Sequence, residues 1–243
     1  TPKGSEIVLS LELLSGITDV DVESMTITAL AGTPLEQLQQ AANDVGFYLP
    51  LDLGARGSCT IGGNVATNAG GNQVLSYGMT RTLVLGLEAV TAEGTVIRSM
   101  NKMLKNNAGY DLKQLFVGSE GTLGVVTEVV LRLYPKPLTK QSALCGFSSF
   151  SQVVSFLQYM QRNCSRVTTF ELMWDNYVKQ VRQMNQQLKP VLTDDHSFYV
   201  LIETEGNDPA RDDDCFNQQL QACIDDGLLN DGFKSGAIKI LIK

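Results

Sequence analysis

One stretch decides the fold: Pro50-Leu51-Asp52-Leu53-Gly54-Ala55-Arg56-Gly57-Ser58-Cys59-Thr60-Ile61-Gly62-Gly63-Asn64-Val65-Ala66-Thr67-Asn68-Ala69-Gly70-Gly71. It has many glycines, few large side chains and little periodicity, so it predicts a loop that approaches a ligand rather than a long regular element. Exposed backbone N–H groups in such turns form nests for anions, including pyrophosphate. Short polar side chains that can bond a phosphate, a ribitol or a ring edge follow one another at Ser58, Thr60, Asn64, Thr67 and Asn68. The alternative interpretation is a glycine-rich surface loop.

The same stretch lacks the features of two common nucleotide sites. No Gly-x-Gly-x-x-Gly follows a strand and opens a helix here, as a Rossmann dinucleotide site requires. No Gly-Lys-Ser or Gly-Lys-Thr occurs, so it is not a P-loop. A nicotinamide enzyme or a nucleoside triphosphatase is therefore disfavoured.

A second glycine-rich segment lies further along the chain, between Asn107 and Thr127. A helix-like part from Asp111 to Phe116 leads into a glycine turn and then a strand at 125–133. Glu120 stands among these glycines, where it is either a turn residue or a contact to a cofactor.

The elements around these segments indicate an α+β protein. We expect strands at 6–11, 25–29, 84–91 and 95–98, and a helix that Thr33 can cap and that ends before Gly46. Two prolines in Tyr134-Pro135-Lys136-Pro137 predict a domain boundary. Beyond it, strands at 140–147, 167–173 and 197–205 alternate with helices at 149–163, 174–188 and 209–226, which favours an antiparallel sheet with helices. The apolar run 238–243 resembles a further strand.

Composition excludes several classes of protein. The chain has 243 residues and a formal charge of -7, which argues against nucleic acid as the main partner. No apolar run is long enough to predict a membrane span. The five cysteines are an odd number, widely spaced and without Cys-x-x-Cys, so we expect neither disulfides nor zinc, and a reducing compartment. His196, the single histidine, is predicted to be solvated in a polar turn, and Trp174 to be a partly buried anchor.

Taken together, the two glycine-rich segments resemble the FAD-binding domain of the vanillyl-alcohol-oxidase (PCMH-type) flavoprotein family. The resemblance is carried by Thr60–Gly71 and by Gly109–Gly124, with Tyr77–Arg81 and Val84–Glu88 between them. Within the family, the run Pro50–Ala55 is most similar to the FAD-dependent D-2-hydroxyacid dehydrogenases. The resemblance continues through Phe170–Met173 and Phe198–Thr204.

The resemblance implies an organisation in two parts. Residues 1–135 would be a partial PCMH-type FAD-binding domain whose first subdomain precedes Thr1. Residues 138–243 would be the start of the FAD-linked oxidase cap, or substrate domain, whose later part follows Lys243. The catalytic base and the family's His-rich metal motif would lie outside this chain, so no catalytic residue and no metal ligand are assigned here.

The resemblance also implies a set of FAD-binding residues. Residues 50–55 and 58–64 would line the flavin and the pyrophosphate, and Thr67, Asn68, Gly70 and Gly71 would continue the same surface. Tyr77 and Gly78 would lie nearby, and residues 120–126 of the second segment would contact the adenosine half. The implied residues are Pro50, Leu51, Gly54, Ala55, Ser58, Cys59, Ile61, Gly62, Gly63, Asn64, Thr67, Asn68, Gly70, Gly71, Tyr77, Gly78, Glu120, Gly121, Gly124 and Val126.

The implied activity is oxidation of a D-2-hydroxy acid, D-2-hydroxyglutarate or D-lactate, to the 2-oxo acid. A base would take the hydroxyl proton while the hydride passes to the flavin. A separate electron acceptor and a homodimer are expected, in the cytoplasm of a bacterium or in the mitochondrial matrix of a eukaryote. Two alternatives remain: another oxidase of the same flavin family, and a non-catalytic fragment that binds FAD.

Overall fold

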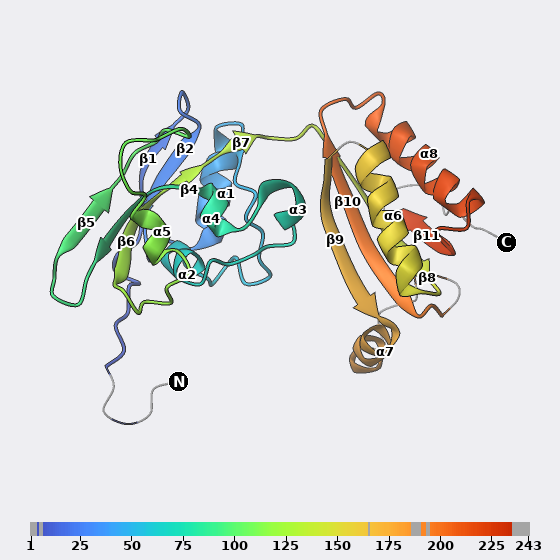
Figure 1. Cartoon of the computed structure of the whole chain (residues 1–243), viewed down its shortest axis with the longest axis horizontal. Helices are drawn as coiled ribbons and strands as arrows, with labels where there is room; N and C mark the ends of the chain where they lie inside the picture. The colour runs from blue at the N-terminus through green and yellow to red at the C-terminus, as the bar shows by residue number, and fades with distance from the viewer. Residues whose placement is uncertain (1–3, 5–6, 165, 186–190, 193–194, 235–243) are drawn as a thin grey trace. The chain divides into compact units, whose positions relative to one another are not determined.

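The computed structural model describes residue 4 and residues 7–164, 166–185, 191–192 and 195–234 (Figure 1). The chain folds into two compact units. Unit 1 comprises Thr1–Gly71 and Tyr77–Lys136, and unit 2 comprises Asn72–Ser76 and Pro137–Lys243. Both units combine helices with antiparallel sheets, which confirms the predicted α+β class.

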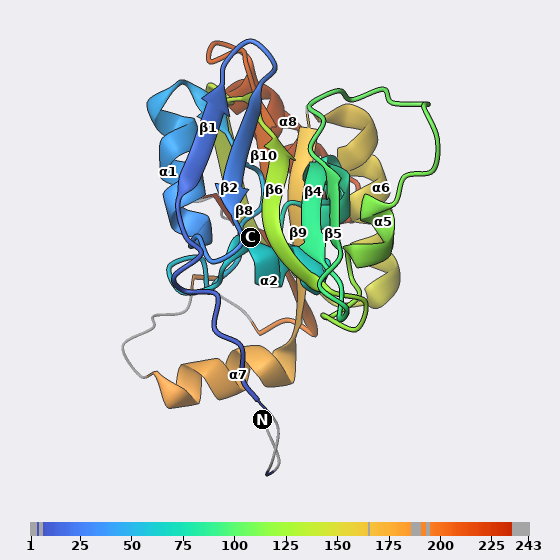
Figure 2. The ribbon, with the colours of Figure 1, turned by 90° about the vertical axis from the view of Figure 1, so that its left-hand side faces the viewer.

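A five-stranded antiparallel sheet forms the centre of unit 1, and Figure 2 shows its strands side by side in the order β1-β2-β6-β4-β5. The predicted strands at 25–29, 84–91, 95–98 and 125–133 are all present. The turn between β4 and β5 closes through a bond from the Thr91 amide to the Thr95 carbonyl. The strands are β1 Ile17–Asp21, β2 Thr26–Leu30, β4 Val84–Val90, β5 Val96–Ser99 and β6 Val125–Arg132.

Two helices, α1 (Leu35–Asp44) and α2 (Ile61–Ala66), supply the rest of the core of unit 1. Leu35, Leu38 and Ile61 are fully buried in one cluster with side chains of the sheet. Shorter elements complete unit 1: β3 Phe47–Tyr48, which pairs with β7 Tyr134–Pro135, and the helical turns α4 Thr80–Leu83 and α5 Lys113–Phe116. The helical turn α3 Val74–Tyr77 lies mostly in the segment Asn72–Ser76 of unit 2. The second glycine-rich segment therefore begins with a single turn of helix, α5, close to the predicted 111–116.

Two expectations for unit 1 are wrong. Residues 7–11 form no strand, and Ile7, Val8 and Leu9 are largely exposed; Glu6 lies outside the described residues. An apolar, β-branched run becomes a strand only where a partner strand is free, and β1 takes the edge position beside β2 instead.

Thr33 does not cap α1. Pro34 occupies the cap position, and no side chain caps the helix. The Thr33 hydroxyl is buried and bonds the carbonyls of Gly16 and Leu30, so it fastens the loop before β1 to the end of β2.

Unit 2 is built on a four-stranded antiparallel sheet in the order β11-β8-β10-β9. Helices α6 and α8 bury Phe156, Met160 and Phe216 against one face of it. Helix α6 begins at a capping box in which Ser149 and Gln152 bond reciprocally. The elements are β8 Thr139–Phe147, α6 Phe150–Asn163, β9 Arg166–Trp174, α7 Asp175–Met184, β10 Phe198–Gly206, α8 Asp212–Asp225 and β11 Asp231–Lys234.

The predicted alternation of strands and helices in unit 2 is confirmed, with ends that move by a few residues. Helix α7 ends at Met184, whereas the prediction extended to 188. Residues 186–190 and the predicted strand at 238–243 lie outside the described residues. No helix in the described ranges is both long and apolar enough to cross a bilayer.

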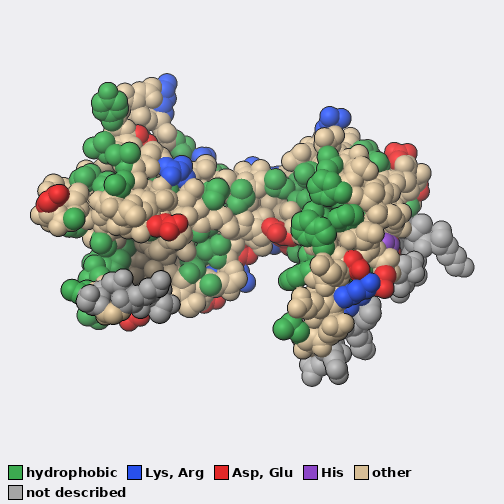
Figure 3. Space-filling model, turned by 60° about the horizontal axis from the view of Figure 1, so that its bottom comes forward, with side chains coloured by type: hydrophobic (Ala, Val, Ile, Leu, Met, Phe, Trp, Pro, Cys, Tyr) green, Lys and Arg blue, Asp and Glu red, His purple; other side chains and the backbone are tan. Residues whose placement is uncertain are grey.

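His196 is buried, and its predicted solvation is wrong. Only a small purple area marks it in the space-filling view (Figure 3). Its backbone amide donates to the Tyr199 hydroxyl, and its Nε2 lies 3.6 Å from Asp231 Oδ2. The ring occupies the space above Gly146 of β8, which has no side chain to exclude it. Trp174 is also more open than predicted, with 55% of its surface exposed.

Replacing Gly146 with alanine should destabilise unit 2 by about 1–3 kcal/mol, because an added Cβ would stand 2.2 Å from His196 Cδ2. The double variant Gly146→Ala/His196→Ala should lose less than the sum of the two single variants, since the smaller side chain removes the clash. Urea denaturation of the four proteins gives the coupling energy. Additive losses would show that the cost of Gly146→Ala does not come from a clash with the His196 ring.

Candidate functional site

The glycine-rich stretch 50–71 folds as a loop that leads into α2. Pro50 and Leu51 are buried, while residues 54–58 form consecutive exposed turns. Backbone bonds attach this loop to α1: the Leu35 amide donates to the Cys59 carbonyl and the Glu36 amide to the Arg56 carbonyl, both at 3.0 Å. The loop is therefore held at its base and open at its outer side.

The glycines of the site are of two kinds. At Gly62 an added Cβ would lie 2.5 Å from Ala31 Cβ, and at Gly71 it would lie 2.4 Å from the Asp52 carbonyl oxygen, so packing within the protein requires these glycines. At Gly54 and Gly121 an added Cβ would meet nothing within 4 Å. Packing does not explain Gly54, while Gly121 has a φ of 79°, which itself favours glycine. Both leave bare backbone that a ligand can approach.

The predicted FAD residues divide in the same way between buried and accessible positions. Seven are buried and can act only as support: Pro50, Leu51, Ile61, Gly62, Asn64, Tyr77 and Val126. The accessible or partly accessible members are Gly54, Ala55, Ser58, Cys59, Gly63, Thr67, Asn68, Gly70, Gly71, Gly78, Glu120, Gly121 and Gly124.

Among the buried members, Ile61 is fully buried in the core, and Tyr77 packs edge-on against Tyr134 with ring centroids 4.9 Å apart. These side chains fix the path of the backbone rather than offer a surface.

The fold brings the two glycine-rich segments together. The amides of Gly118 and Glu120 donate to the carbonyls of Val65 and Ala66 at 3.0 and 2.9 Å, so the second segment satisfies the carbonyl groups at the end of α2. Asn68 and Glu120 both have positive φ, at 48° and 51°, which is uncommon outside glycine. Such strained residues persist where the surrounding structure holds them, and they gather at ligand sites.

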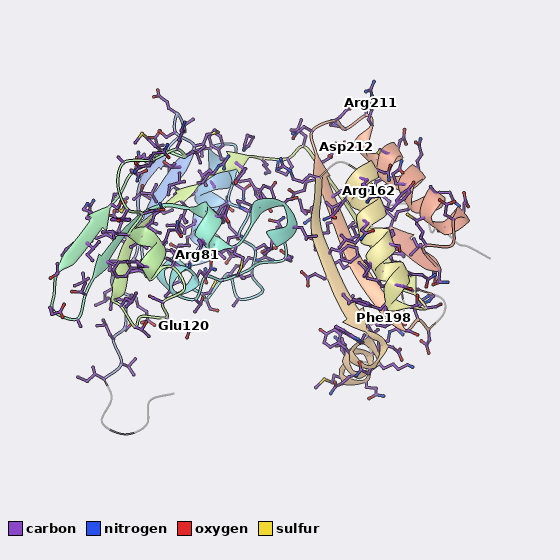
Figure 4. All side chains as sticks on the ribbon, viewed as in Figure 1. Arg81, Glu120, Arg162, Phe198, Arg211 and Asp212 are labelled. Atoms are coloured by element: carbon purple, nitrogen blue, oxygen red, sulfur yellow. The ribbon has the colours of Figure 1, made fainter. Side chains whose placement is uncertain are left out.

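Arg81 fastens this junction, and sequence reasoning did not single it out. Its guanidinium donates to the Gln114 carbonyl at 2.8 Å, to Gln114 Oε1 at 2.7 Å and to the Val117 carbonyl. Its backbone amide donates to Asn68 Oδ1 at 2.9 Å. Arg81 and Glu120 both come from unit 1, Arg81 from α4 (Figure 4). One residue thus ties both segments to α4; we call this set of bonds the Arg81 clasp.

A cavity of about 560 Å³ opens beside the clasp. Its lining includes three cations, Arg81, Lys113 and Arg132, and one carboxylate, Asp111. Lys113 bonds Asp111, which lowers the pKa of that carboxyl group. The Arg132 guanidinium lies 4.4 Å from the centre of the Tyr134 ring. In an acidic chain this local excess of positive charge can receive an anionic group.

All five cysteines are free thiols. Among the residues that the structure describes, no group of three or more His, Cys, Asp or Glu side chains is placed to hold a metal ion.

Three thiols, two buried and one (Cys164) partly buried, should resist modification in the native protein. Burial raises the pKa of Cys145, and it raises the pKa of Cys164 and of Cys223 to about 12. Because the thiolate is the reactive form, these three should react with a disulfide reagent at pH 8 on the order of 10³-fold more slowly than a free cysteine. Their rates should still rise tenfold per pH unit at pH 9. The denatured chain is the control, and fast native labelling of Cys164 would contradict the prediction.

Comparison with known proteins relates most of the chain to two families of FAD-linked proteins. Residues 2–99 match the family described as FAD binding domain, and residues 136–236 match the C-terminal domain of FAD linked oxidases. The chain thus carries domains of flavin-dependent oxidoreductases.

Curated relatives share both segments. A Bos taurus protein named mitochondrial D-2-hydroxyglutarate dehydrogenase is 44% identical over 96% of this chain and 42% of its own length. A Xanthomonas citri D-2-hydroxyglutarate dehydrogenase is 37% identical over 93% of this chain and 47% of its own length. A Saccharomyces cerevisiae D-2-hydroxyglutarate–pyruvate transhydrogenase is also 37% identical, over 95% and 47%. The chain therefore spans less than half the length of these relatives.

A solved structure supports the fold. An alkyldihydroxyacetonephosphate synthase superposes with a TM-score of 0.70 over 93% of this chain and 42% of the synthase, at 22% identity. At this sequence identity, the structural similarity supports the fold and nothing more.

Proposed function

We propose that the open face of unit 1, formed by the loop 54–58, the accessible positions between Gly63 and Gly71, and the turn at Glu120–Gly121, holds the FAD. The observation that carries the proposal is the open, exposed Gly54, whose bare backbone neither internal packing nor a positive φ explains. The exposed Gly63 and Gly121 add bare backbone to the same face. Thr67, Asn68 and Ser58 add neutral hydrogen-bonding groups beside them. The donor set is therefore suited to a dinucleotide that is held through backbone and amide dipoles.

The role of this chain in such a site is to hold and orient. The buried members, such as Ile61 and Tyr77, keep the loop in one shape, and the Arg81 clasp keeps the two segments in register. A binding surface that already has its bound shape loses less conformational entropy when the ligand binds. When bound, FAD supplies the acceptor for a hydride from the substrate.

We infer further that the protein oxidises a D-2-hydroxy acid to the 2-oxo acid, with D-2-hydroxyglutarate as the first candidate. The names of the curated relatives support this substrate. In the domain assignment that we propose, residues 1–135 bind FAD and residues 138–243 contribute to the substrate domain. The separate electron acceptor, the homodimer and the cytoplasmic or mitochondrial location stay predictions from the resemblance.

A visible absorption spectrum of the full-length gene product tests the proposal. The purified protein should be yellow, and D-2-hydroxyglutarate should bleach it in the absence of oxygen, whereas the L enantiomer should not. D-Lactate is the comparison substrate within the same class. Bleaching by neither acid would exclude the hydroxy acid activity but not the flavin site, and a protein that never holds flavin would exclude both.

A further inference from the structure

Unit 2 has a second sheet face that α6 and α8 do not cover. Ala143, Cys145 and Val200 point into the core with those helices. Because side chains alternate along a strand, Leu144 of β8 and Tyr199 of β10 point to the opposite side. Tyr199 pairs with Met173 of β9, which therefore lies on the same face.

Helix α7 lies against this second face but leaves space beneath it. Tyr177, Val178 and Val181 are neighbours on one side of the helix, as their spacing requires. None of the residues of α7 is fully buried. An amphipathic helix normally buries its apolar stripe, so the stripe of α7 is only partly packed.

The space is an apolar cavity of about 180 Å³. Its apolar lining comes from the sheet, from α7 and from the loop after α7: Leu144, Met173, Tyr199, Tyr177, Val178, Val181 and Val191. An engineered apolar cavity of about 150 Å³ in another protein stays dry and takes up benzene. The cavity of unit 2 is thus large enough for one small ring.

One cation belongs to the same cavity. Arg182 lines it, and its guanidinium carbon lies 5.9 Å from the centre of the Tyr199 ring. The nearest carboxylate oxygen that the structure shows for it is Asp195 Oδ1 at 3.7 Å, which is too long for a direct hydrogen bond. The guanidinium of Arg182 therefore has N–H groups that can donate hydrogen bonds to a second carboxylate in a better position.

We propose that this cavity binds a small organic acid with an apolar body, such as an aromatic carboxylate. The ring fills the space between α7 and the sheet, and the carboxylate bonds the Arg182 guanidinium. The site lies wholly within unit 2 and does not depend on the flavin site of unit 1.

Benzoate and its neutral counterpart benzamide are the probes. Isothermal titration of the chain should show benzoate binding at least tenfold more tightly than benzamide, with a difference that shrinks as salt is added. The fluorescence of Trp174, the single tryptophan, gives a second signal, because Trp174 immediately precedes α7.

Three variants separate the parts of the site. Val181→Phe fills the cavity and should abolish binding of both probes. Arg182→Gln should reduce benzoate to the affinity of benzamide. Lys179→Gln is the matched control, since Lys179 carries the same charge on the same helix and lies 3.9 Å from Asp195 but does not line the cavity; its affinities should stay within twofold of the parent chain.

The proposal fails if neither probe binds the parent chain, if Val181→Phe binds as the parent does, or if Arg182→Gln keeps the preference for benzoate. Thermal melting of each variant checks its fold. If Val181→Phe does not melt cooperatively, Leu144→Phe enters the same cavity from the sheet side and takes its place.

Discussion

Alanine at Gly62 should destabilise unit 1 by about 1–3 kcal/mol, whereas alanine at the adjacent Gly63 should not. The Cβ at position 62 would overlap Ala31, whose carbonyl accepts the Gly62 amide at 2.8 Å, so α2 would have to move off β2. At position 63 the nearest atom to an added Cβ is Thr60 Oγ1, at 3.4 Å. There the loss of glycine flexibility should stabilise the helix by up to about 1 kcal/mol.

The same pair of variants tests the proposed cofactor surface. Gly63 is exposed on the side that we assign to FAD, so Gly63→Ala should weaken FAD binding while leaving the free energy of unfolding unchanged or raised. Urea denaturation and a flavin fluorescence titration of each variant give the two quantities. A Gly63→Ala protein that binds FAD as the parent does would remove Gly63 from the cofactor surface.

Replacing Arg81 with alanine should have the largest effect of any single substitution at the site, a loss of about 2–4 kcal/mol of unfolding free energy. The substitution leaves the Gln114 and Val117 carbonyls without their charged donor. Arg81→Lys should recover only part of this loss, because an ammonium cannot reproduce the planar fork. Denaturation monitored by circular dichroism measures both variants.

Arg98→Gln is the control for the charge change. Arg98 pairs with Glu88 and Glu128 on an exposed strand, with more than half of its side chain in solvent, so its loss should cost less than about 1 kcal/mol. If FAD lies on both glycine-rich segments, Arg81→Lys should also weaken FAD binding at least tenfold under conditions where the variant is fully folded. Equal losses for the Arg81 and Arg98 variants would show that the clasp has no special role.

The sequence predicts unit 2 well because its long strands and the helices α6 and α8 each bury one face. The alternation in β8 and β10 and the apolar stripe of α6 follow directly from packing on a single sheet. The strand expected at 6–11 fails because an apolar run carries no information on whether a partner strand is free. Thr33 fails as a cap because a tertiary partner, the loop at Gly16, competes for its hydroxyl.

The candidate site is predictable only in part. The glycine-rich segments mark where the backbone is unusual, but the sequence cannot separate Gly62, which is required by packing, from Gly63, which is open. Arg81 is not apparent because its main acceptors are backbone carbonyls more than 30 residues away, and those have no signature in the sequence. The burial of His196 is also not apparent from the sequence. The space that its ring fills is left by Gly146 of β8, which is distant along the chain.

The short segment Asn72–Ser76 has a consequence for dissecting this protein. It belongs to unit 2, where Gln73 bonds Glu205 at 3.1 Å and the Ser76 hydroxyl bonds the Val167 carbonyl at 2.7 Å, although the chain on both sides of it belongs to unit 1. The chain therefore passes between the units after Gly71, after Ser76 and after Lys136. A protease that cut between Lys136 and Pro137 would leave residues 72–76 in the amino-terminal fragment. These residues would still be bonded to unit 2, which is in the carboxyl-terminal fragment. The two halves would then behave as complementing fragments that copurify, and neither would be a self-sufficient domain when expressed alone.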